Sequence, residues 1–242
     1  MRRLLITISL LFMISGISAG AGPKISENGN KHNFSSSNTA VNYRAIDDGD
    51  PRSKQICVFC HTPHRSSGEG PLWNRRATSV SFFKRYSSPT LAIDDATATG
   101  ATAYGQPSGS SRLCLSCHDG VTALGAVFTT PGTTTSVDIP FNINTIGYET
   151  YSSHHPVSFN YNEAVRRLLT DPPFNKDLRL TSPTDYDPNV RLDKQERMQC
   201  TTCHDPHQDK SATAGDTHPF WVTTTYEKVC ESCHELPLPP SP

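Results

Sequence analysis

Cys57-Val-Phe-Cys60-His61 is the first of four stretches in which two cysteines three positions apart are followed at once by a histidine. The others are Cys114-Leu-Ser-Cys117-His118, Cys200-Thr-Thr-Cys203-His204 and Cys230-Glu-Ser-Cys233-His234, and together the four use all eight cysteines. C-x-x-C-H is the signature of c-type haem attachment, because two thiols at this spacing reach the two vinyl groups of one porphyrin and the adjoining imidazole reaches its iron. The motifs predict four covalently attached haem c groups. Their predicted proximal ligands are His61, His118, His204 and His234.

Other chemistries of paired cysteines fit this pattern less well. Eight cysteines in an exported chain could form four disulfides, bind two zinc ions or act as redox-active dithiols. None of these requires a histidine after every pair. The chain has ten histidines among 242 residues, so four coincidences have a chance probability on the order of a few in a million. We therefore adopt haem attachment as the interpretation.

The composition indicates a core that side chains alone do not fill. Only 35% of the residues are hydrophobic, and the chain has 19 prolines and 15 glycines. A globular domain normally has about 45–50% apolar residues. Four large macrocycles would supply the missing apolar volume. The aromatic residues predicted to pack on porphyrin faces are Phe59, Trp73, Phe82, Phe83, Phe159 and Trp221.

Regular secondary structure is predicted to be sparse. The best helical stretch is Asn162–Leu169, which ends before Asp171-Pro172-Pro173 because proline cannot continue a helix. Short helices are expected around the attachment motifs. Segments 87–111 and 129–136, rich in Ser, Thr, Gly and Ala, are expected to be exposed loops. The segment 171–193, dense in Pro and Asp, is expected to connect two halves of the molecule, and the proline-rich tail is expected to be extended.

The N-terminus predicts export. Residues 1–21 read as a signal peptide, with Arg2 and Arg3 before an apolar stretch and small residues that suit cleavage after Ala19 or Ala21. A retained anchor is less favoured because the apolar stretch is shorter than the ~20 residues of a spanning helix. Losing both arginines reduces 22 basic residues to 20 against 23 acidic ones, a formal charge of −3. That charge gives no basis for binding nucleic acid or an anionic membrane.

Histidine is the predicted sixth ligand of each iron. Methionine is a common alternative, but Met1 and Met13 leave with the signal peptide and only Met198 remains. Six histidines lie outside the attachment positions: His32, His64, His154, His155, His207 and His218. The count permits two histidines on every iron.

An internal repeat ranks these candidates. Two motifs extend as C-x-x-C-H-x-P-H and end at His64 and His207, whereas the other two do not. The order is extended, plain, extended, plain, which predicts a first di-haem unit over 22–150 and a second over 151–242 within one continuous haem-packed domain.

His64 and His207 are the strongest distal candidates. Because chain geometry keeps three-residue separations within ~10 Å, two haems that share one extended motif must be close neighbours. One more histidine precedes each unit: His32 in the first, and His155, favoured over the adjacent His154, in the second. His218 is a spare candidate.

Several of these segments carry a family resemblance. They are Lys31-His32-Asn33-Phe34-Ser35, the extended motifs Cys57 to His64 and Cys200 to His207, and His155-Pro156-Val157. They resemble the tetrahaem outer-surface cytochromes of metal-reducing bacteria, most closely the OmcE type, which polymerises into extracellular cytochrome filaments. The resemblance implies a fold of mostly coil with a few short helices, wrapped around a stack of four haems. It also implies histidine on both faces of each iron and a histidine passed between subunits.

Three functions are therefore weighed, and the first is favoured. A conductive extracellular filament would carry electrons to external acceptors, with haems stacked across subunits of a homopolymer. A soluble tetrahaem shuttle of the periplasm or cell surface would dock transiently with redox partner proteins. A reductase would need an iron without a distal histidine and nearby acid or base groups, and the surplus of histidines argues against that vacancy. We expect a carrier of electrons at the cell surface or outside the cell, and no enzyme.

Overall fold

The computed structural model describes residues 22–76, 78–83, 85–86, 88, 91–93, 100–128, 137–141, 155–210 and 220–235. Several predictions lie outside these residues: the signal peptide, the distal candidates His154 and His218, the loop 129–136, the tail 236–242 and the boundary between units at residue 150.

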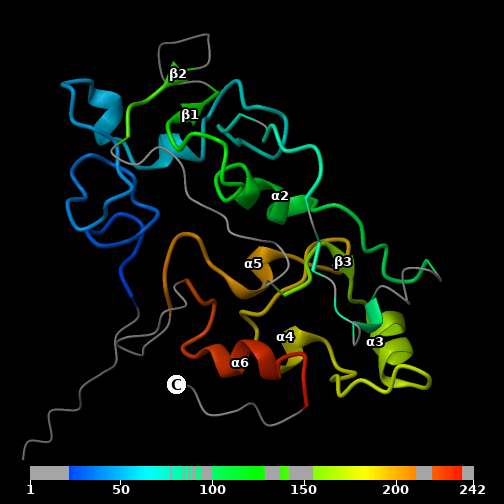
Figure 1. The fold of residues 1–242 in the computed structure, drawn as a ribbon. Helices are drawn as coiled ribbons and strands as arrows, with labels where there is room; N and C mark the ends of the chain where they lie inside the picture. The colour runs from blue at the N-terminus through cyan, green and yellow to red at the C-terminus, as the bar shows by residue number, and fades with distance from the viewer. Residues whose placement is uncertain are drawn as a thin grey trace, which may run out of the picture.

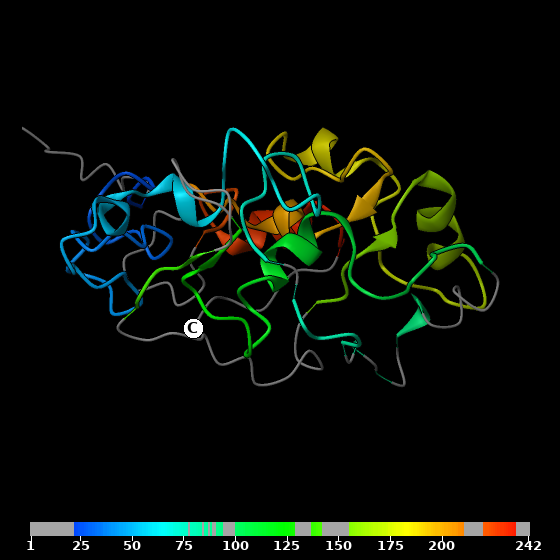
Figure 2. The ribbon, with the colours of Figure 1, turned by 90° about the horizontal axis from the view of Figure 1, so that it is seen from above.

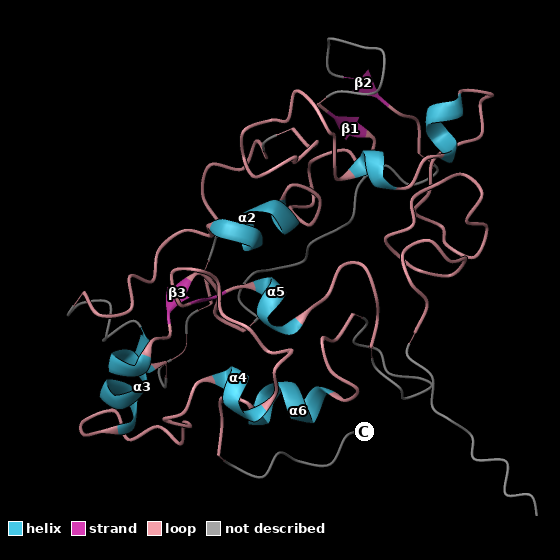
Figure 3. Ribbon diagram, turned by 180° about the vertical axis from the view of Figure 1, so that it is seen from behind, coloured by secondary structure: helices cyan, strands magenta, loops and turns pink. Residues whose placement is uncertain are grey.

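The described chain is mostly coil (Figures 1 and 3), and this confirms the prediction of sparse regular structure. Its 3-10 helices are η1 (Pro51–Lys54) and η2 (Cys57–Phe59), and its α-helices are α2 (Gly109–Leu115), α3 (Glu163–Thr170), α4 (Pro183–Tyr186), α5 (Cys200–Cys203) and α6 (Tyr226–Glu231). Two antiparallel pairs of short strands complete it, β1 (Ala126–Val127) with β2 (Val137–Asp138) and β3 (Phe159–Asn160) with β4 (Arg197–Met198). No helix of the described part is long and apolar enough to cross a bilayer.

Helix α3 forms where the sequence predicts it and begins one residue later. The side chain of Asn162 caps it by accepting a hydrogen bond from the backbone N–H of Val165 at 3.0 Å. Arg167 and Glu163 also form an ion pair of 2.7 Å on the helix surface, and their spacing of four residues is favourable for such a pair. The helix ends at Thr170, and Asp171 caps it before the prolines.

The hydrophobic core of the described residues is divided into three clusters, and attachment cysteines belong to the first and pack against the other two. The first surrounds Phe159 and includes Cys233. The second surrounds Phe59 and has Cys60 and Cys117 packed against it. The third is small and has Cys203 packed against it. Core and motifs therefore coincide, as expected if the cofactors complete the core.

The second and third motifs meet where α2 packs on α5, in the middle of an elongated molecule (Figures 1 and 2). The hydroxyls of Ser110 and Thr201 lie 2.6 Å apart, and the Ser111 hydroxyl donates to the Gln199 amide oxygen at 2.6 Å. Gly109 permits this approach, because it has a φ of +54° and a Cβ there would lie 2.9 Å from the Gln199 Nε2.

The segment 171–193, expected to connect two halves of the molecule, makes specific contacts of its own. It packs against the fourth motif through a β-bridge between Leu178 and His234 and a backbone hydrogen bond of 2.8 Å from Arg179 to Cys233. Within it, α4 lies beside α6 (Figures 1 and 3), and the Tyr186 hydroxyl donates to Glu231 at 2.6 Å.

Candidate haem sites

All four C-x-x-C-H motifs adopt the same local turn. In each, the backbone N–H of the histidine donates to the carbonyl of the first cysteine, at 2.7 Å for His61, 3.0 Å for His118, 3.0 Å for His204 and 2.9 Å for His234. This is one turn of helix, formed by η2, α5 and the last turns of α2 and α6. It brings two thiols and an imidazole together, as attachment to one porphyrin requires.

The cysteines, all of them in the described part, are free thiols, so the disulfide alternative finds no support. Burial raises the pKa of several above the ordinary value for a thiol, to about 12 for Cys60 and Cys233. Burial also raises the pKa of Cys117 and Cys203. Among the described residues no group of three or more His, Cys, Asp or Glu side chains gathers as a metal site would need. The thiols lie in apolar surroundings that suit a porphyrin edge.

The two extended motifs have the same fold, and this repeat is longer than the sequence pattern suggested. A β-bridge joins His61 to Trp73 in the first and His204 to Trp221 in the second. Corresponding backbone hydrogen bonds run from Thr62 to Leu72 (2.9 Å) and from Asp205 to Phe220 (2.7 Å).

The residue before each tryptophan also has a left-handed backbone, with φ of +57° at Leu72 and +71° at Phe220. The sequence analysis missed the signal for this, a Pro-x-Trp triplet at Pro71 and again at Pro219.

The rings of His61 and His207 lie close together, and their planes are nearly parallel. Their ring centroids are 6.2 Å apart with an interplanar angle of 18°. Two imidazoles that bind one metal from opposite sides, with bonds of about 2 Å, have centroids roughly 6 Å apart. Burial and the neighbouring His207 lower the pKa of His61 and favour its neutral form. The extended motif of the second unit thus reaches the first motif.

His32 and His118 form a second pair, with centroids 6.1 Å apart and planes at 80°. The His32 Nδ1 lies 3.0 Å from the carbonyl of Pro206, and because a carbonyl only accepts, Nδ1 donates and Nε2 keeps its lone pair. Phe220 stacks on the same ring with centroids 4.3 Å apart. Burial, reinforced by His118, lowers the pKa of His32 to about 4. His32 is therefore a neutral imidazole with one free nitrogen.

His155, beside the fourth motif, is hydrogen-bonded in the same way as His32. Its Nδ1 donates to the carbonyl of Pro156 at 2.8 Å, and burial lowers its pKa. Burial, followed by the neighbouring His155, also lowers the pKa of His234. Both rings line an open cavity of about 390 Å³, together with Cys233 and apolar side chains such as Phe159 and Leu169. Sites for small organic cofactors commonly measure about 300–1,000 Å³.

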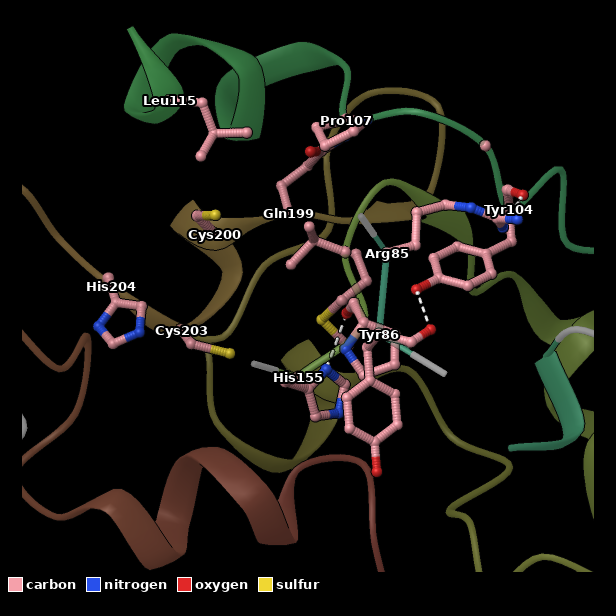
Figure 4. Close-up of a pocket in the computed structure, with 14 residues that line it drawn as sticks. Arg85, Tyr86, Tyr104, Pro107, Leu115, His155, Gln199, Cys200, Cys203 and His204 are labelled. Carbon is pink, nitrogen blue, oxygen red and sulfur yellow. Dashed lines mark hydrogen bonds between the residues drawn. The ribbon is translucent and has the colours of Figure 1, made fainter. Parts of the chain in front are cut away.

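A second cavity, of about 120 Å³, faces the third motif (Figure 4). Cys200, Cys203 and His204 lie on one side of it, whereas Tyr86 and Tyr104 lie on another, joined by a hydrogen bond of 3.1 Å. His155 borders this cavity as well as the larger one. Protein surrounds the residue, but it is exposed because it adjoins both cavities. The His204 ring stacks on Trp221, with centroids 4.7 Å apart.

His64 has different surroundings from its counterpart His207. It lies on an exposed loop, where the Thr62 hydroxyl donates to its carbonyl at 2.7 Å. Among the described residues it is not paired with a motif histidine. Its role as a distal ligand stays a prediction from sequence, as do those of His154 and His218, which lie outside the described residues.

Successive motifs adjoin one another in chain order. Cys60 and Cys117 interact electrostatically in one cluster. Cys114 and Cys200 contact each other directly, and this contact raises the pKa of the Cys114 thiol and lowers that of the Cys200 thiol. Cys203 interacts electrostatically with Cys233. Cofactors attached to these thiols would therefore lie close to one another.

The residues therefore fit haem c: paired thiols lie on helical turns, further histidines lie near the motif histidines, and motif residues line two cavities. Comparison with known families agrees over part of the chain. A family model described as a doubled CXXCH motif matches residues 194–236, which contain the third and fourth motifs. No curated protein matches the chain. Covalent haem attachment by paired C-x-x-C-H motifs in a chain of mostly coil indicates a multihaem c-type cytochrome.

Proposed function

We propose that this protein transfers electrons through four haems, each held between two histidines, and that it does so outside the cell as the subunit of a filament. The observation that carries electron transfer is the pairing of motif histidines with distant histidines at the separation that one iron requires, 6.2 Å for His61 with His207 and 6.1 Å for His118 with His32. When bound, haem iron supplies one-electron chemistry between its ferric and ferrous states.

The histidines would fix each iron in a closed coordination sphere. Burial favours the neutral form of the His32 and His155 rings, and each Nδ1 donates to a backbone carbonyl, so that Nε2 of each ring would be the nitrogen that could bind iron. Two histidine ligands leave no position for a substrate, and this favours a carrier over a reductase. Histidine in place of methionine as the sixth ligand also favours low reduction potentials.

The spacing of the sites supports transfer along the chain. The direct contact of Cys114 with Cys200 would bring the edges of the second and third porphyrins together. His204 and His207 are close in the chain, so a haem on His204 would adjoin one shared by His61 and His207. An electron could then pass between neighbours without leaving the protein.

Absorption spectroscopy tests the electron-transfer proposal. The purified holoprotein should be low-spin at all four haems when oxidised and when reduced, and carbon monoxide should leave the reduced spectrum unchanged. A carbon monoxide adduct at one haem would reveal an open iron and favour the reductase instead.

The filament and the extracellular location rest on the resemblance of the motifs described above. Negative-stain microscopy of concentrated holoprotein separates this proposal from the soluble shuttle. Ordered fibres are expected, whereas strictly monomeric particles at high concentration would favour the shuttle.

A further inference from the structure

Arg75 is a fully buried cation in the first half of the molecule. It follows Trp73 and Asn74 in the first extended motif and is 0% exposed. Its guanidinium donates to the backbone carbonyls of Leu124, of Ala123 at 2.7 Å and of Ser116 at 3.3 Å, and its Nε–H has no partner. All three carbonyls belong to the loop that carries the second attachment motif.

No carboxylate of the described residues forms an ion pair with Arg75. Arginine stays protonated in proteins, and an uncompensated buried charge is costly. Backbone carbonyls offset only part of this cost. The structure therefore keeps a permanent positive charge where water does not screen it.

The charge lies between the first two haem sites. Cys60 and Cys117 both pack on the second hydrophobic cluster. Asn74, the residue before Arg75, donates its backbone N–H to the Cys60 carbonyl at 2.9 Å, and Arg75 itself donates to the carbonyl of Ser116, next to Cys117, at 3.3 Å. In keeping with this placement, Arg75 opposes the rise that burial causes in the pKa of both thiols. The same guanidinium thus stabilises negative charge at both attachment points. Asp119 acts in the opposite direction at Cys117, and its effect there ranks below that of Arg75.

We propose that Arg75 is a tuning residue that raises the reduction potentials of the haems attached at Cys57/Cys60 and at Cys114/Cys117. The inference rests on the proposed function. Reduction adds one electron to the cofactor, and a fixed cation in a medium of low dielectric constant stabilises the added charge. The two haems of the first half would hold electrons more tightly than they would without it.

A spectroelectrochemical titration of the holoprotein tests this. In Arg75→Gln, which removes the charge and keeps a polar amide, two of the four midpoint potentials should fall. Arg75→Lys keeps the charge and should leave all four near the wild-type values. If both variants shift equally, packing and not charge is responsible, and the proposal is wrong. It is also wrong if Arg75→Gln shifts none.

Two control variants separate a local field from general effects. Arg167→Gln removes an exposed arginine that pairs with Glu163 and changes the net charge equally, so it should leave the potentials unchanged. Arg166→Gln removes another buried arginine, which donates to the carbonyls of Tyr161 and Leu180 beside Cys233. It should not move the two potentials that Arg75→Gln moves.

A further variant covers the case in which Arg75→Gln does not mature. Asp119→Asn removes the opposing charge near Cys117 and should raise one potential alone, because the second haem would then experience the arginine unopposed. No rise would contradict tuning by fixed charges at this site. If wild-type protein shows no reversible reduction at all, the proposed function fails. Reversible wild-type titration with unmoved variants refutes only the inference.

Discussion

His64 and His207 occupy the same position of the repeated motif, yet only His207 faces a motif histidine, His61. His207→Ala should therefore leave one iron with a single protein ligand and convert one haem of four to high spin. The absorption spectrum of the oxidised protein measures this. His64→Ala is the matched control from the other copy, and in dilute protein it should leave all haems low-spin. A high-spin haem in His64→Ala would favour the assignment made from sequence.

The ring planes of the two closest pairs differ, and this predicts two kinds of magnetic signal. The imidazoles of His61 and His207 are nearly parallel at 18°, whereas those of His32 and His118 are nearly perpendicular at 80°. Parallel ligand planes give a low-spin ferric haem an ordinary rhombic signal, whereas perpendicular planes give a strongly anisotropic one. Electron paramagnetic resonance of the oxidised holoprotein should contain both. A spectrum with rhombic signals alone would contradict the His32–His118 geometry.

The secondary-structure elements show which features of the fold the sequence predicts. Helix α3 is predictable because its determinants are local: a capping Asn162, a Glu163–Arg167 pair and prolines after Asp171. The turns of the motifs follow from their own spacing. The pairing of His207 with His61 is not predictable in this way, since it depends on how α5 packs on α2, and nothing local to either histidine encodes that contact.

Residues on both sides of β4 hold this junction together. Gln199 is 1% exposed and joins Ser111 of α2 to Asp193, to which its amide donates at 2.9 Å. Asp193 also accepts hydrogen bonds from the backbone N–H groups of Gln195 and Arg197, at 2.8 and 2.9 Å. Burial acts to raise the pKa of this carboxyl, but the hydrogen bonds outweigh burial, and its pKa lies below the ordinary value.

Because the pKa of Asp193 is lower in the folded state than in the unfolded state, its ionised carboxylate stabilises the fold at pH values above the unfolded-state pKa. That contribution should disappear as the pH falls below about 4, through the folded pKa. Asp193→Asn should lower the free energy of unfolding at neutral pH by about 1–2 kcal/mol, and its difference from wild type should shrink as the solution is acidified. Denaturant titrations of holoprotein at several pH values measure this.

An exposed carboxylate provides the control for Asp193. Asp47 forms a surface ion pair of 3.4 Å with Lys54, so Asp47→Asn should change the free energy of unfolding by less than about 1 kcal/mol at neutral pH. If both variants lose the same stability at every pH, the hydrogen bonds of Asp193 do not matter for the junction.

On the scale of the whole molecule, the two predicted di-haem units are interlocked. His207 of the second reaches His61 of the first, His32 of the first is oriented by Pro206 of the second, and Cys114 contacts Cys200. Attachment cysteines belong to or pack against each hydrophobic cluster. In the part of the chain that the structure describes, the first cluster contains residues of both halves, and attached cofactors would be shared across the contact between halves.

This arrangement predicts one cooperative unfolding transition for the holoprotein. Loss of the His61–His207 ligand pair and loss of the α2–α5 contact should occur together, because each brings residues of both halves to one place. The Soret absorbance and far-ultraviolet circular dichroism should then give coincident curves in guanidinium. Gln199→Ala, which leaves buried partners such as the Ser111 hydroxyl unsatisfied, should lower the stability by roughly 1–3 kcal/mol without separating the curves. Two resolved transitions in wild-type protein would mean that the halves fold independently and that the contact between them forms late.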